Sequence, residues 1–320
     1  MPIRLIYEAD VNDLITMHDA MLAVETAMHA QGSGRAVNTP RQRVHQPDGV
    51  LHMMGGAMLE QRYWGYKAYT TTKHGARFMV ALYDSESGAP LALIEANRLG
   101  QLRTGAASGV ATQYLARHNS RVLALFGTGF QAETQLIAMA MAMPLREVRV
   151  YGRNEQRRTA FVERMQPFVK VPLRAVDSPA AALDGADIIN TVTTAREPLF
   201  DANLLPYGVH INAVGSNSAA KAELDPAVIR QCTQIFTDDV EQARSESGNL
   251  ILAYERNMLN WANVRPLSEV VAQKMLGRTR GDDVSLFASH GVAIWDIALA
   301  GIVYERATTQ NLGTLIEFGG

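Results

Sequence analysis

The spacing of hydrophobic residues divides the chain into three stretches with different expected structures. Between Asp10 and Ala30 apolar side chains recur every three or four residues, which predicts one or two helices. From Asn38 short apolar runs alternate with turn residues, and this pattern predicts an antiparallel sheet closed by a helix from about Leu102 to Arg117. The expected strands contain Val44, Val50 to Met54, Tyr63 to Thr72, Phe78 to Tyr83 and Leu91 to Glu95.

After Asn119 the pattern becomes strand, helix, strand, helix, which is typical of a parallel doubly wound sheet of the Rossmann type. The last apolar periodicity, Val292 to Thr308, predicts a helix that returns to the first part of the chain. We therefore expect an α/β protein with two domains, one formed by residues 1–117 and 292–320 with α+β structure, and one formed by residues 118–291. The strands expected in the second domain are Val122–Phe126, Val148–Tyr151, Leu173–Val176, Ile188–Val192, His210–Val214, Ile235–Thr237 and Ser285–Ala288.

The apolar run Val122–Phe126 leads directly into a glycine-rich turn, Gly127-Thr128-Gly129-Phe130-Gln131-Ala132, and then into a helical pattern. In a dinucleotide-binding turn the first glycine makes the tight bend, the second admits the pyrophosphate, and the small third residue lets the helix pack on the sheet. The phosphates then bind to free N–H groups at the helix N-terminus. Glycine pairs are common in turns, so the position between a strand and a helix is what makes this turn a candidate cofactor site.

The second Rossmann strand is followed by Arg153 and Asn154, about twenty residues beyond the glycine-rich turn. An acidic residue at this place would bind the ribose 2′-hydroxyl of NAD, whereas an arginine suits the 2′-phosphate of NADP. The sequence therefore favours NADP(H), with NAD(H) as the other possibility. The alternative is a solvated arginine in a loop that also holds Arg157 and Arg158.

Composition excludes several classes of function. The 320 residues are 47% hydrophobic and 19% charged, with a formal net charge of -2, so we expect a globular protein without a basic surface for nucleic acid. A single cysteine, Cys232, allows no internal disulfide and is consistent with the cytoplasm. No apolar run reaches membrane-spanning length, and scattered histidines predict no metal site.

Several motifs in sequence order resemble the ornithine cyclodeaminase and mu-crystallin family of NAD(P)-dependent proteins. The likeness extends over nearly the whole chain, and the family includes cyclodeaminases, amino-acid dehydrogenases, imine and ketimine reductases and a hormone-binding crystallin. The motifs are Pro40-Arg41, Asp48-Gly49-Val50 with Met53-Met54, Gly65-Tyr66-Lys67, Tyr83-Asp84 with Gly88 and Pro90, residues 102–108, residues 127–132, residues 186–189, residues 210–215, Glu223-Leu224-Asp225-Pro226, and residues 286–293.

This resemblance implies a homodimer in which the first domain carries both the substrate pocket and the subunit contact. It also implies that Arg41, Lys67 and Arg103 bind the substrate α-carboxylate, for which planar guanidinium groups are well suited. Read without the family, each would more often be a solvated surface charge. The residues expected at the cofactor, besides the glycine-rich turn and Arg153 with Asn154, are Val192, Val214, Gly215, Ser216, His290, Gly291 and Val292.

Two departures from the family pattern bear on the substrate. Ornithine cyclodeaminases carry a Glu where this chain has His52, and an Asp where it has Asn217. Both carboxylates handle the distal amine in those enzymes, and an amide cannot act as a general base at neutral pH. Ornithine is therefore disfavoured. His52 is either part of the substrate site or a packed strand residue, and His290 is either near the nicotinamide or a polar loop residue.

The activity that these features favour is NAD(P)H-dependent reduction of the C=N bond of a small α-imino acid, or the reverse oxidation of an amino acid. Arg41 and Arg103 would hold the carboxylate, Lys67 would protonate the imine nitrogen or bind the carboxylate as well, and Asn217 would hydrogen-bond the nitrogen. The surplus of positive charge, to which His52, His74, Arg77 or His290 could add, suits a dicarboxylic imino acid. The alternatives are ammonia elimination by a cyclodeaminase with catalytic NAD and a binding protein of the mu-crystallin type without turnover.

Overall fold

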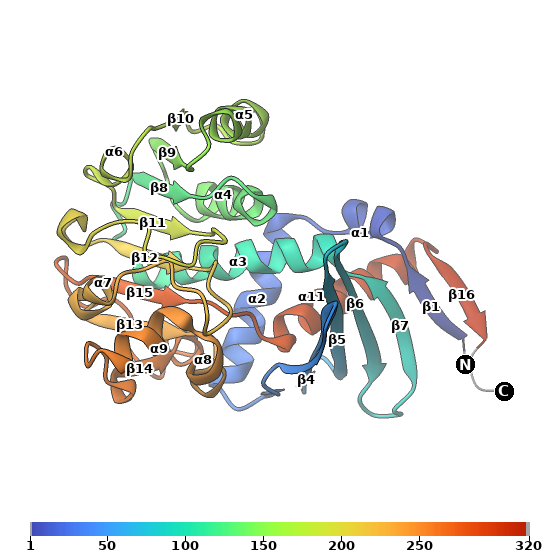
Figure 1. Cartoon of the computed structure of the whole chain (residues 1–320). Helices are drawn as coiled ribbons and strands as arrows, with labels where there is room; N and C mark the ends of the chain where they lie inside the picture. Colours follow the sequence, from blue (N-terminus) through green and yellow to red (C-terminus); the bar gives the residue numbers. More distant parts are fainter. Residues whose placement is uncertain (1, 318–320) are drawn as a thin grey trace. The chain divides into compact units, whose positions relative to one another are not determined.

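The computed structural model describes residues 2–317, which fold into two compact units (Figure 1). The first unit comprises Met1–Arg103 and Gly291–Gly320, and the second comprises Thr104–His290. The first boundary falls inside helix α3 (Asn97–Leu115), whereas the sequence placed it after residue 117. The reason is that the later part of the helix packs in the second unit, where Gln135 donates a hydrogen bond to the carbonyl of Thr104.

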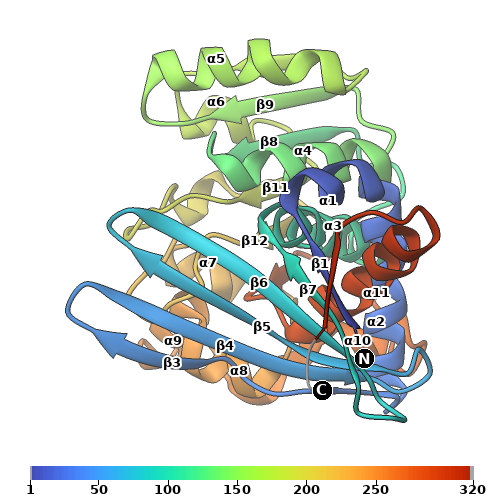
Figure 2. The ribbon, with the colours of Figure 1, turned by 90° about the vertical axis from the view of Figure 1, so that its right-hand side faces the viewer.

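The first unit is built on a long mixed sheet with the strand order β16-β1-β7-β6-β5-β4-β2, and β3 pairs with β4. Figure 2 shows β4, β5 and β6 as neighbouring long strands. Helices α1 (Glu8–Leu14), α2 (Met17–Gly32) and α11 (Ala293–Thr309) complete the unit. The strands are β1 (Pro2–Ile6), β2 (Ala36–Asn38), β3 (Gln42–Gln46), β4 (Gly49–Met58), β5 (Tyr63–Thr72), β6 (Gly75–Asp84), β7 (Pro90–Glu95) and β16 (Thr314–Glu317).

The expectation of a purely antiparallel sheet in this unit was wrong at one edge. Strand β1 pairs in parallel with β7 and in antiparallel fashion with β16, and neither β1 nor β16 was expected from the sequence. Both strands lie outside the run of strands and turns that predicted the rest of this sheet, β1 before the first helices and β16 after the last one. Helix α11 returns to this unit as the sequence indicated, and it contacts α2, β4 and β5.

The second unit contains the parallel doubly wound sheet that the sequence predicts. Every strand pairs in parallel with its neighbours, in the order β10-β9-β8-β11-β12-β15-β13-β14. The strands are β8 (Val122–Phe126), β9 (Glu147–Tyr151), β10 (Leu173–Ala175), β11 (Ile188–Thr191), β12 (His210–Ala213), β13 (Gln234–Thr237), β14 (Val264–Pro266) and β15 (Ser285–Ala288).

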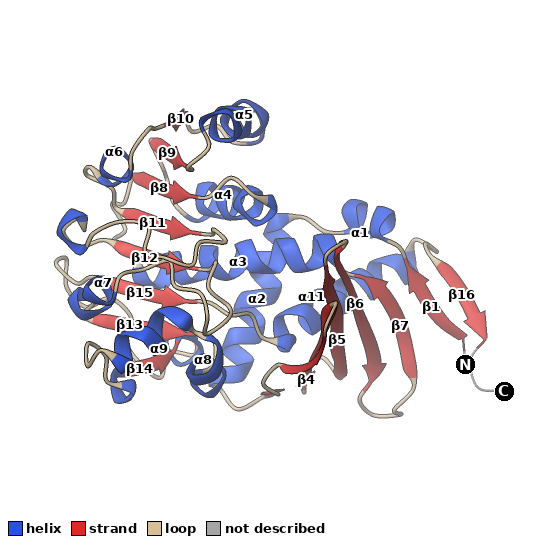
Figure 3. Ribbon diagram, in the orientation of Figure 1, coloured by secondary structure: helices blue, strands red, loops and turns tan. Residues whose placement is uncertain are grey.

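Helices cover both faces of this sheet, with α3, α4 and α5 on one side and α6 and α7 on the other (Figure 3). The strands are buried on both faces, as is usual for parallel sheets between helices. The helices are α4 (Phe130–Ala142), α5 (Glu155–Met165), α6 (Pro179–Leu183), α7 (Pro226–Gln231), α8 (Val240–Glu246), α9 (Gly248–Glu255) and α10 (Leu267–Val271).

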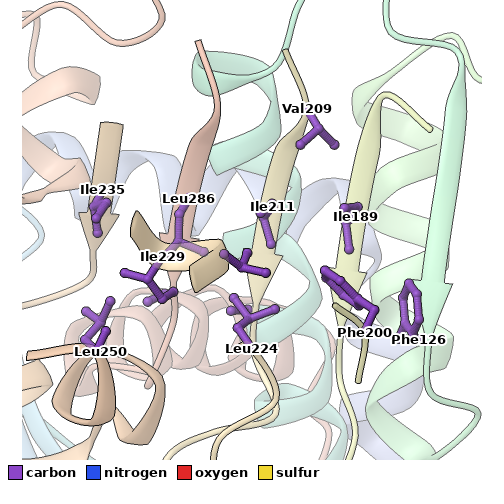
Figure 4. Close-up of a cluster of buried hydrophobic side chains, with 14 of the residues drawn as sticks. Phe126, Ile189, Phe200, Val209, Ile211, Leu224, Ile229, Ile235, Leu250 and Leu286 are labelled. Atoms are coloured by element: carbon purple, nitrogen blue, oxygen red, sulfur yellow. The ribbon is translucent and has the colours of Figure 1, made fainter. Parts of the chain in front are cut away.

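A continuous apolar cluster forms the core on the α7 side of the sheet. Successive strands contribute Phe126, Ile189, Ile211 and Leu286, which lie side by side in Figure 4. Because each of these strands ends at the same edge, the core fixes the loops that follow their carboxyl ends. In open α/β sheets this edge is where ligands bind.

Candidate active site

Lys67 is the most deeply buried cation of the first unit's sheet, with 2% of its surface exposed. It belongs to β5, on the face that also carries Tyr69, because side chains alternate along a strand. Its ammonium nitrogen lies 5.9 Å from the centre of the Tyr69 ring and 5.2 Å from that of Phe78. On α3, a Cβ at Gly100 would lie 2.9 Å from the same nitrogen, so the glycine leaves room for the amine.

The counter-charge of Lys67 comes from Asp296 in the first turn of α11. Asp296 Oδ1 accepts hydrogen bonds from Lys67 Nζ at 2.8 Å and from Arg103 Nε at 3.2 Å. The carboxylate is completely buried, and its position near the helix N-terminus is favourable for a negative charge. A charge buried in a strand needs such a partner, and Asp296 supplies it.

Arg103 and Arg41 complete the cation cluster, which we define as Arg41, Lys67 and Arg103. Both arginines are 8% exposed. Arg41 Nη2 donates to the carbonyl of Gly291 at 3.3 Å, and its Nε lies 3.3 Å from Met54 Sδ. Gly291 has a φ of 78°, and a Cβ there would lie 2.2 Å from Arg103 Nη1, so only glycine fits. The structure thus brings together all three residues that the sequence assigned to the carboxylate.

The electrostatics of the cluster lower the pKa values of both Lys67 and Asp296. Burial, aided by Arg103 and Arg41 and opposed by Asp296, lowers the pKa of Lys67 to about 8. Burial is the largest of these effects. Burial raises the pKa of Asp296, but Arg103 and Lys67 outweigh it and hold this pKa below its ordinary value. Three cations and one carboxylate leave a surplus of positive charge that suits an anionic ligand.

His52 on β4 is a packed strand residue on the same face of the sheet. Its ring stacks on Tyr69 with centroids 4.2 Å apart, and Nε2 lies 3.1 Å from Thr71 Oγ1. Burial, with Arg43, Arg41 and His45 nearby, lowers the pKa of His52 to about 4, so it is neutral at pH 7. Its Nδ1 has no hydrogen-bond partner among the described residues and remains able to bind a ligand.

Two other residues considered for an anionic substrate lie elsewhere in the first unit. Arg77 pairs with Thr70 in the register of β5 and β6, whereas Lys67 pairs with Val80, so Arg77 projects from the opposite face of the sheet. His74 lies in the exposed turn between these strands. The structure therefore separates Arg77 from the face that carries Lys67, whereas Arg43, which the sequence did not single out, faces His52 across β3 and β4.

The glycine-rich turn in the second unit has the geometry that a dinucleotide requires. Gly127 has a φ of 121°, and a Cβ there would lie 2.8 Å from the carbonyl oxygen of Val192. Gly129 caps the N-terminus of α4, and a Cβ there would meet no atom within 4 Å. Ala132 is fully buried against the sheet, as the third position of the motif demands. The turn therefore fits a pyrophosphate group.

A cavity of about 390 Å³ adjoins this turn. It combines the phosphate-binding turn with the end of β9, where the ribose of a dinucleotide is recognised. The expected cofactor residues that line it are Gly127, Thr128, Gly129, Arg153, Asn154 and Val192, and further lining residues are Phe126, Tyr151, Gly152, Arg157, Thr193, Thr194, Ala195 and Leu199.

Glu223 was missed as a residue that organises the cofactor side. It is fully buried and accepts four hydrogen bonds at the carboxyl ends of β11 and β12. Oε1 accepts from Thr193 N at 2.6 Å and Thr193 Oγ1 at 2.7 Å, and Oε2 accepts from Thr191 Oγ1 at 2.9 Å and Gly215 N at 2.8 Å. Burial raises the pKa of Glu223, and these donors offset only part of that rise.

The other expected cofactor residues occupy varied surroundings. Val214 and Gly215 follow β12 and are tied by their N–H groups to Thr191 and Glu223. Phe130 is exposed and Gln131 half-buried on the first turn of α4. His290 donates its N–H to Asp238 Oδ2 at 2.6 Å, whereas Gly291 and the buried Val292 belong to the first unit. Ser216 is buried and donates to the Lys221 carbonyl, and Asn217 is exposed.

A sequence pattern could have revealed Asp296. It is the single charged residue in the run Val292-Ala-Ile-Trp-Asp-Ile-Ala-Leu-Ala-Gly301, and an isolated acid on an apolar helix needs a buried cation. Glu223 stands in the motif Glu223-Leu224-Asp225-Pro226, but its position in a loop of mixed polarity before α7 did not indicate a buried role. No helix in the described part of the chain is long and apolar enough to span a membrane, and residues 2–317 hold no group of three or more acidic, histidine or cysteine side chains suited to a metal.

Comparison with known proteins agrees with this geometry. The model of the ornithine cyclodeaminase/mu-crystallin family matches residues 4–311. The chain belongs to this family. The structure of Thermococcus litoralis Δ1-pyrroline-2-carboxylate reductase in complex with NADH and L-proline is similar, with 30% identity, a TM-score of 0.93 and coverage of 98% of this chain and 99% of that one.

Two further structures of family members are similar over nearly their full lengths. An archaeal alanine dehydrogenase dimer with bound NAD is 31% identical, with a TM-score of 0.94 and full coverage of both chains. The iminosuccinate reductase of Paracoccus denitrificans in complex with NAD+ is 27% identical, with a TM-score of 0.92 and coverage of 99% of this chain and 100% of that one.

Proposed function

We propose that this protein is an NAD(P)H-dependent oxidoreductase that reduces the C=N bond of a small α-imino acid or oxidises the corresponding amino acid. The observation that carries the proposal is the buried cation cluster of Arg41, Lys67 and Arg103 with the carboxylate of Asp296 between Lys67 and Arg103. Its family relatives include a pyrroline-2-carboxylate reductase, an alanine dehydrogenase and an iminosuccinate reductase. All three act at a carbon that bears both nitrogen and a carboxylate.

In this proposal Arg41 and Arg103 bind the substrate carboxylate. A guanidinium group binds a carboxylate with two parallel hydrogen bonds and so fixes its orientation as well as its position. Because both arginines are nine-tenths buried, water competes weakly for the carboxylate. The fixed carboxylate holds the neighbouring imine carbon in one place, which makes the following step effectively intramolecular.

Lys67 is the proposed proton donor. Its pKa of about 8 lies close to neutral pH, where a general acid is most effective, because it is still mostly protonated but gives up its proton readily. One Nζ–H bond breaks, an N–H bond forms on the imine nitrogen, and the neutral amine of Lys67 recovers a proton from water. Asn217 is proposed to hydrogen-bond the same nitrogen without contributing charge.

The dinucleotide, when bound, supplies the hydride. The turn at Gly127 to Ala132 is proposed to hold its pyrophosphate, and the 390 Å³ cavity beside Arg153 and Asn154 its adenosine end. The similar structures hold NADH, NAD and NAD+. We nevertheless propose a preference for NADP(H) here, because Arg153 and Arg157 both line the cavity and could bind a 2′-phosphate.

The substrate class that we propose is a dicarboxylic imino acid. Arg43 and His52 are directly opposite each other in the register of β3 and β4, on the face that carries Lys67. His52 Nδ1 has no partner among residues 2–317, and Arg43 carries a charge beyond those that bind one carboxylate. These observations support the proposal that the two groups bind a distal carboxylate, as iminosuccinate would present.

We also propose a homodimer formed through the outer face of the first unit's sheet, in the cytoplasm. That face exposes Val44, Leu51, Met53, Trp64 and Tyr66, each at least 37% accessible. Such a contiguous apolar surface marks an interaction site. The related alanine dehydrogenase is a dimer, and sedimentation at several concentrations tests whether this chain is one.

The test of the function is a spectrophotometric assay at 340 nm. NADPH or NADH is mixed with pyruvate, glyoxylate or oxaloacetate plus ammonia, or with cyclic imines such as Δ1-pyrroline-2-carboxylate. We expect cofactor oxidation that Lys67→Ala and Arg103→Ala abolish while cofactor binding stays unchanged. Loss of cofactor affinity in both variants would contradict their assignment to the substrate.

The same assay separates the substrate classes and the two alternatives. Arg43→Leu is expected to reduce turnover of oxaloacetate with ammonia more than turnover of pyruvate with ammonia, and an unchanged ratio argues against the distal site. Ammonia release from ornithine with no net absorbance change would indicate a cyclodeaminase. Saturable binding of cofactor and ligand without consumption of either would indicate a binding protein.

A further inference from the structure

The carboxylate of Asp296 contacts two of the three residues of the cation cluster through a single oxygen. Oδ1 accepts from Lys67 and Arg103, whereas Oδ2 is buried and accepts no hydrogen bond from the described residues. A buried carboxylate with one oxygen unsatisfied is a costly way to stabilise a fold, and well-packed apolar residues would do so better. This arrangement points to a role in the chemistry of the site.

The contact constrains how Arg103 can meet a ligand. Asp296 occupies Nε of the guanidinium, so the edge formed by Nη1 and Nη2 is the one that remains for a bidentate carboxylate. Gly291 leaves room for Nη1, because a Cβ there would lie 2.2 Å from it. Asp296 therefore fixes the guanidinium on its Nε side, and the glycine leaves space at the other end.

The contact also determines the charge of Lys67. The groups that face its amine are Arg103 from α3, Asp296 from α11 and Arg41 from the loop before β3, while the rings of Tyr69 on β5 and Phe78 on β6 flank it. Burial and both arginines favour the neutral amine, and Asp296 alone opposes them. Removing that carboxylate leaves three positive groups together in a buried place.

We propose that Asp296 is a positioning residue: it keeps Lys67 as the ammonium group that protonates the imine nitrogen, and it orients Arg103 so that Nη1 and Nη2 meet the substrate carboxylate. This inference rests on the proposed function. It also assigns a carboxylate to a site in which His52 replaces a carboxylate of ornithine cyclodeaminases. Asp296 acts through Lys67 and Arg103.

The test compares Asp296→Asn with wild type in the imine-reduction assay between pH 5.5 and 10. The substitution keeps the shape and the Oδ1 acceptor but removes the charge. We expect kcat at pH 7 to fall about tenfold or more, within the range of general-acid contributions. The high-pH limb of the kcat profile is expected to move down by about 1 to 3 pH units, the size of the effect of an opposite charge at this distance.

The matched control is Asp19→Asn. Asp19 also pairs with a cation on α11, Arg306, at 2.7 Å, but it lies outside the cation cluster. This variant is expected to keep the wild-type kcat profile. The proposal is overturned if Asp296→Asn keeps the wild-type kcat and the wild-type position of the high-pH limb. It is also overturned if Asp19→Asn moves that limb by the same amount as Asp296→Asn.

A second variant and a second measurement keep the proposal testable. If Asp296→Asn does not fold, Asp296→Glu retains the charge and is expected to keep the limb near the wild-type position with a lower kcat; a displaced limb overturns the proposal. Calorimetric titration with pyruvate, without cofactor, should show affinity falling above about pH 8 in wild type and from lower pH in Asp296→Asn. If the pH profiles of pyruvate affinity coincide for wild type and Asp296→Asn, the proposal is overturned, whether or not the enzyme reduces an imine. If wild type reduces no imine, only the proposed function is contradicted.

Discussion

Replacing Glu223 by glutamine should weaken both the second unit and its affinity for a dinucleotide. All four groups that bond to this carboxylate are donors, and two of them are the backbone N–H groups of Thr193 and Gly215. A glutamine NH2 must face one of these N–H groups whichever way the amide is turned. The hydroxyls of Thr191 and Thr193 can rotate to accept, but a backbone N–H cannot.

One buried N–H group left without a partner costs about 1–3 kcal/mol. The free energy of unfolding in urea should therefore fall by about that amount, measured by circular dichroism at pH 7. The affected loops follow β11 and β12, at the edge where the dinucleotide is proposed to bind. If ordering those loops around the cofactor costs about 1.4 kcal/mol more in the variant than in wild type, the Kd for NADH or NADPH rises about tenfold.

Fluorescence titration of the reduced cofactor measures that Kd, and Glu246→Gln is the control. Glu246 is equally buried in the same unit and accepts from Gln242, but it lies on α8, outside both loops. We expect the control to keep its cofactor affinity. Unchanged stability and unchanged Kd in Glu223→Gln would refute the argument that this carboxylate holds the loops.

Three further substitutions test other parts of the molecule. Arg153→Ser should shift the ratio of kcat/KM for NADPH over NADH toward NADH, and an unchanged ratio removes Arg153 from the 2′-phosphate site. Gly127→Ala should abolish cofactor binding in the same titration, because φ is 121° and the added carbon would lie 2.8 Å from the Val192 carbonyl. Asp19→Asn should cost about 1 kcal/mol at pH 7, since Arg306 and other donors hold the pKa of Asp19 well below its ordinary value. That stability is present above the ordinary carboxyl pKa, so the gap to wild type should close in urea titrations below about pH 4.

The sequence predicted the elements whose residues repeat a pattern over several positions. Strands β5, β8 and β15 have the expected bounds, and helix α11 begins within one residue of its expected start. Strands β1 and β16 were missed because their stability comes from pairing and not from their own composition: β1 pairs with both β16 and β7, and β16 pairs with β1. Local propensity carries no information about such partners.

The candidate site divides in the same way. Arg41, Lys67 and Arg103 could be named from motifs, and the structure shows that they converge. Asp296 could not be paired with Lys67 from sequence, because contacts between residues so far apart in the chain are set by packing. Arg77 was misassigned because alternation along β6, which places it on the other face, depends on a register that only the paired strands define.

The origin of Asp296 in the last helix has a consequence for synthesis of the protein on the ribosome. Residues 2–103 emerge first, yet the helix that covers their sheet and neutralises Lys67 is made only after the whole second unit. The second unit is continuous in sequence and can fold as it is synthesised. The inner face of the first unit's sheet stays uncovered until α11 has been made. Truncation before residue 293 should therefore leave a chain whose middle is folded and whose beginning depends on chaperones. Lys67 gains its buried counter-charge only after α11 has been made.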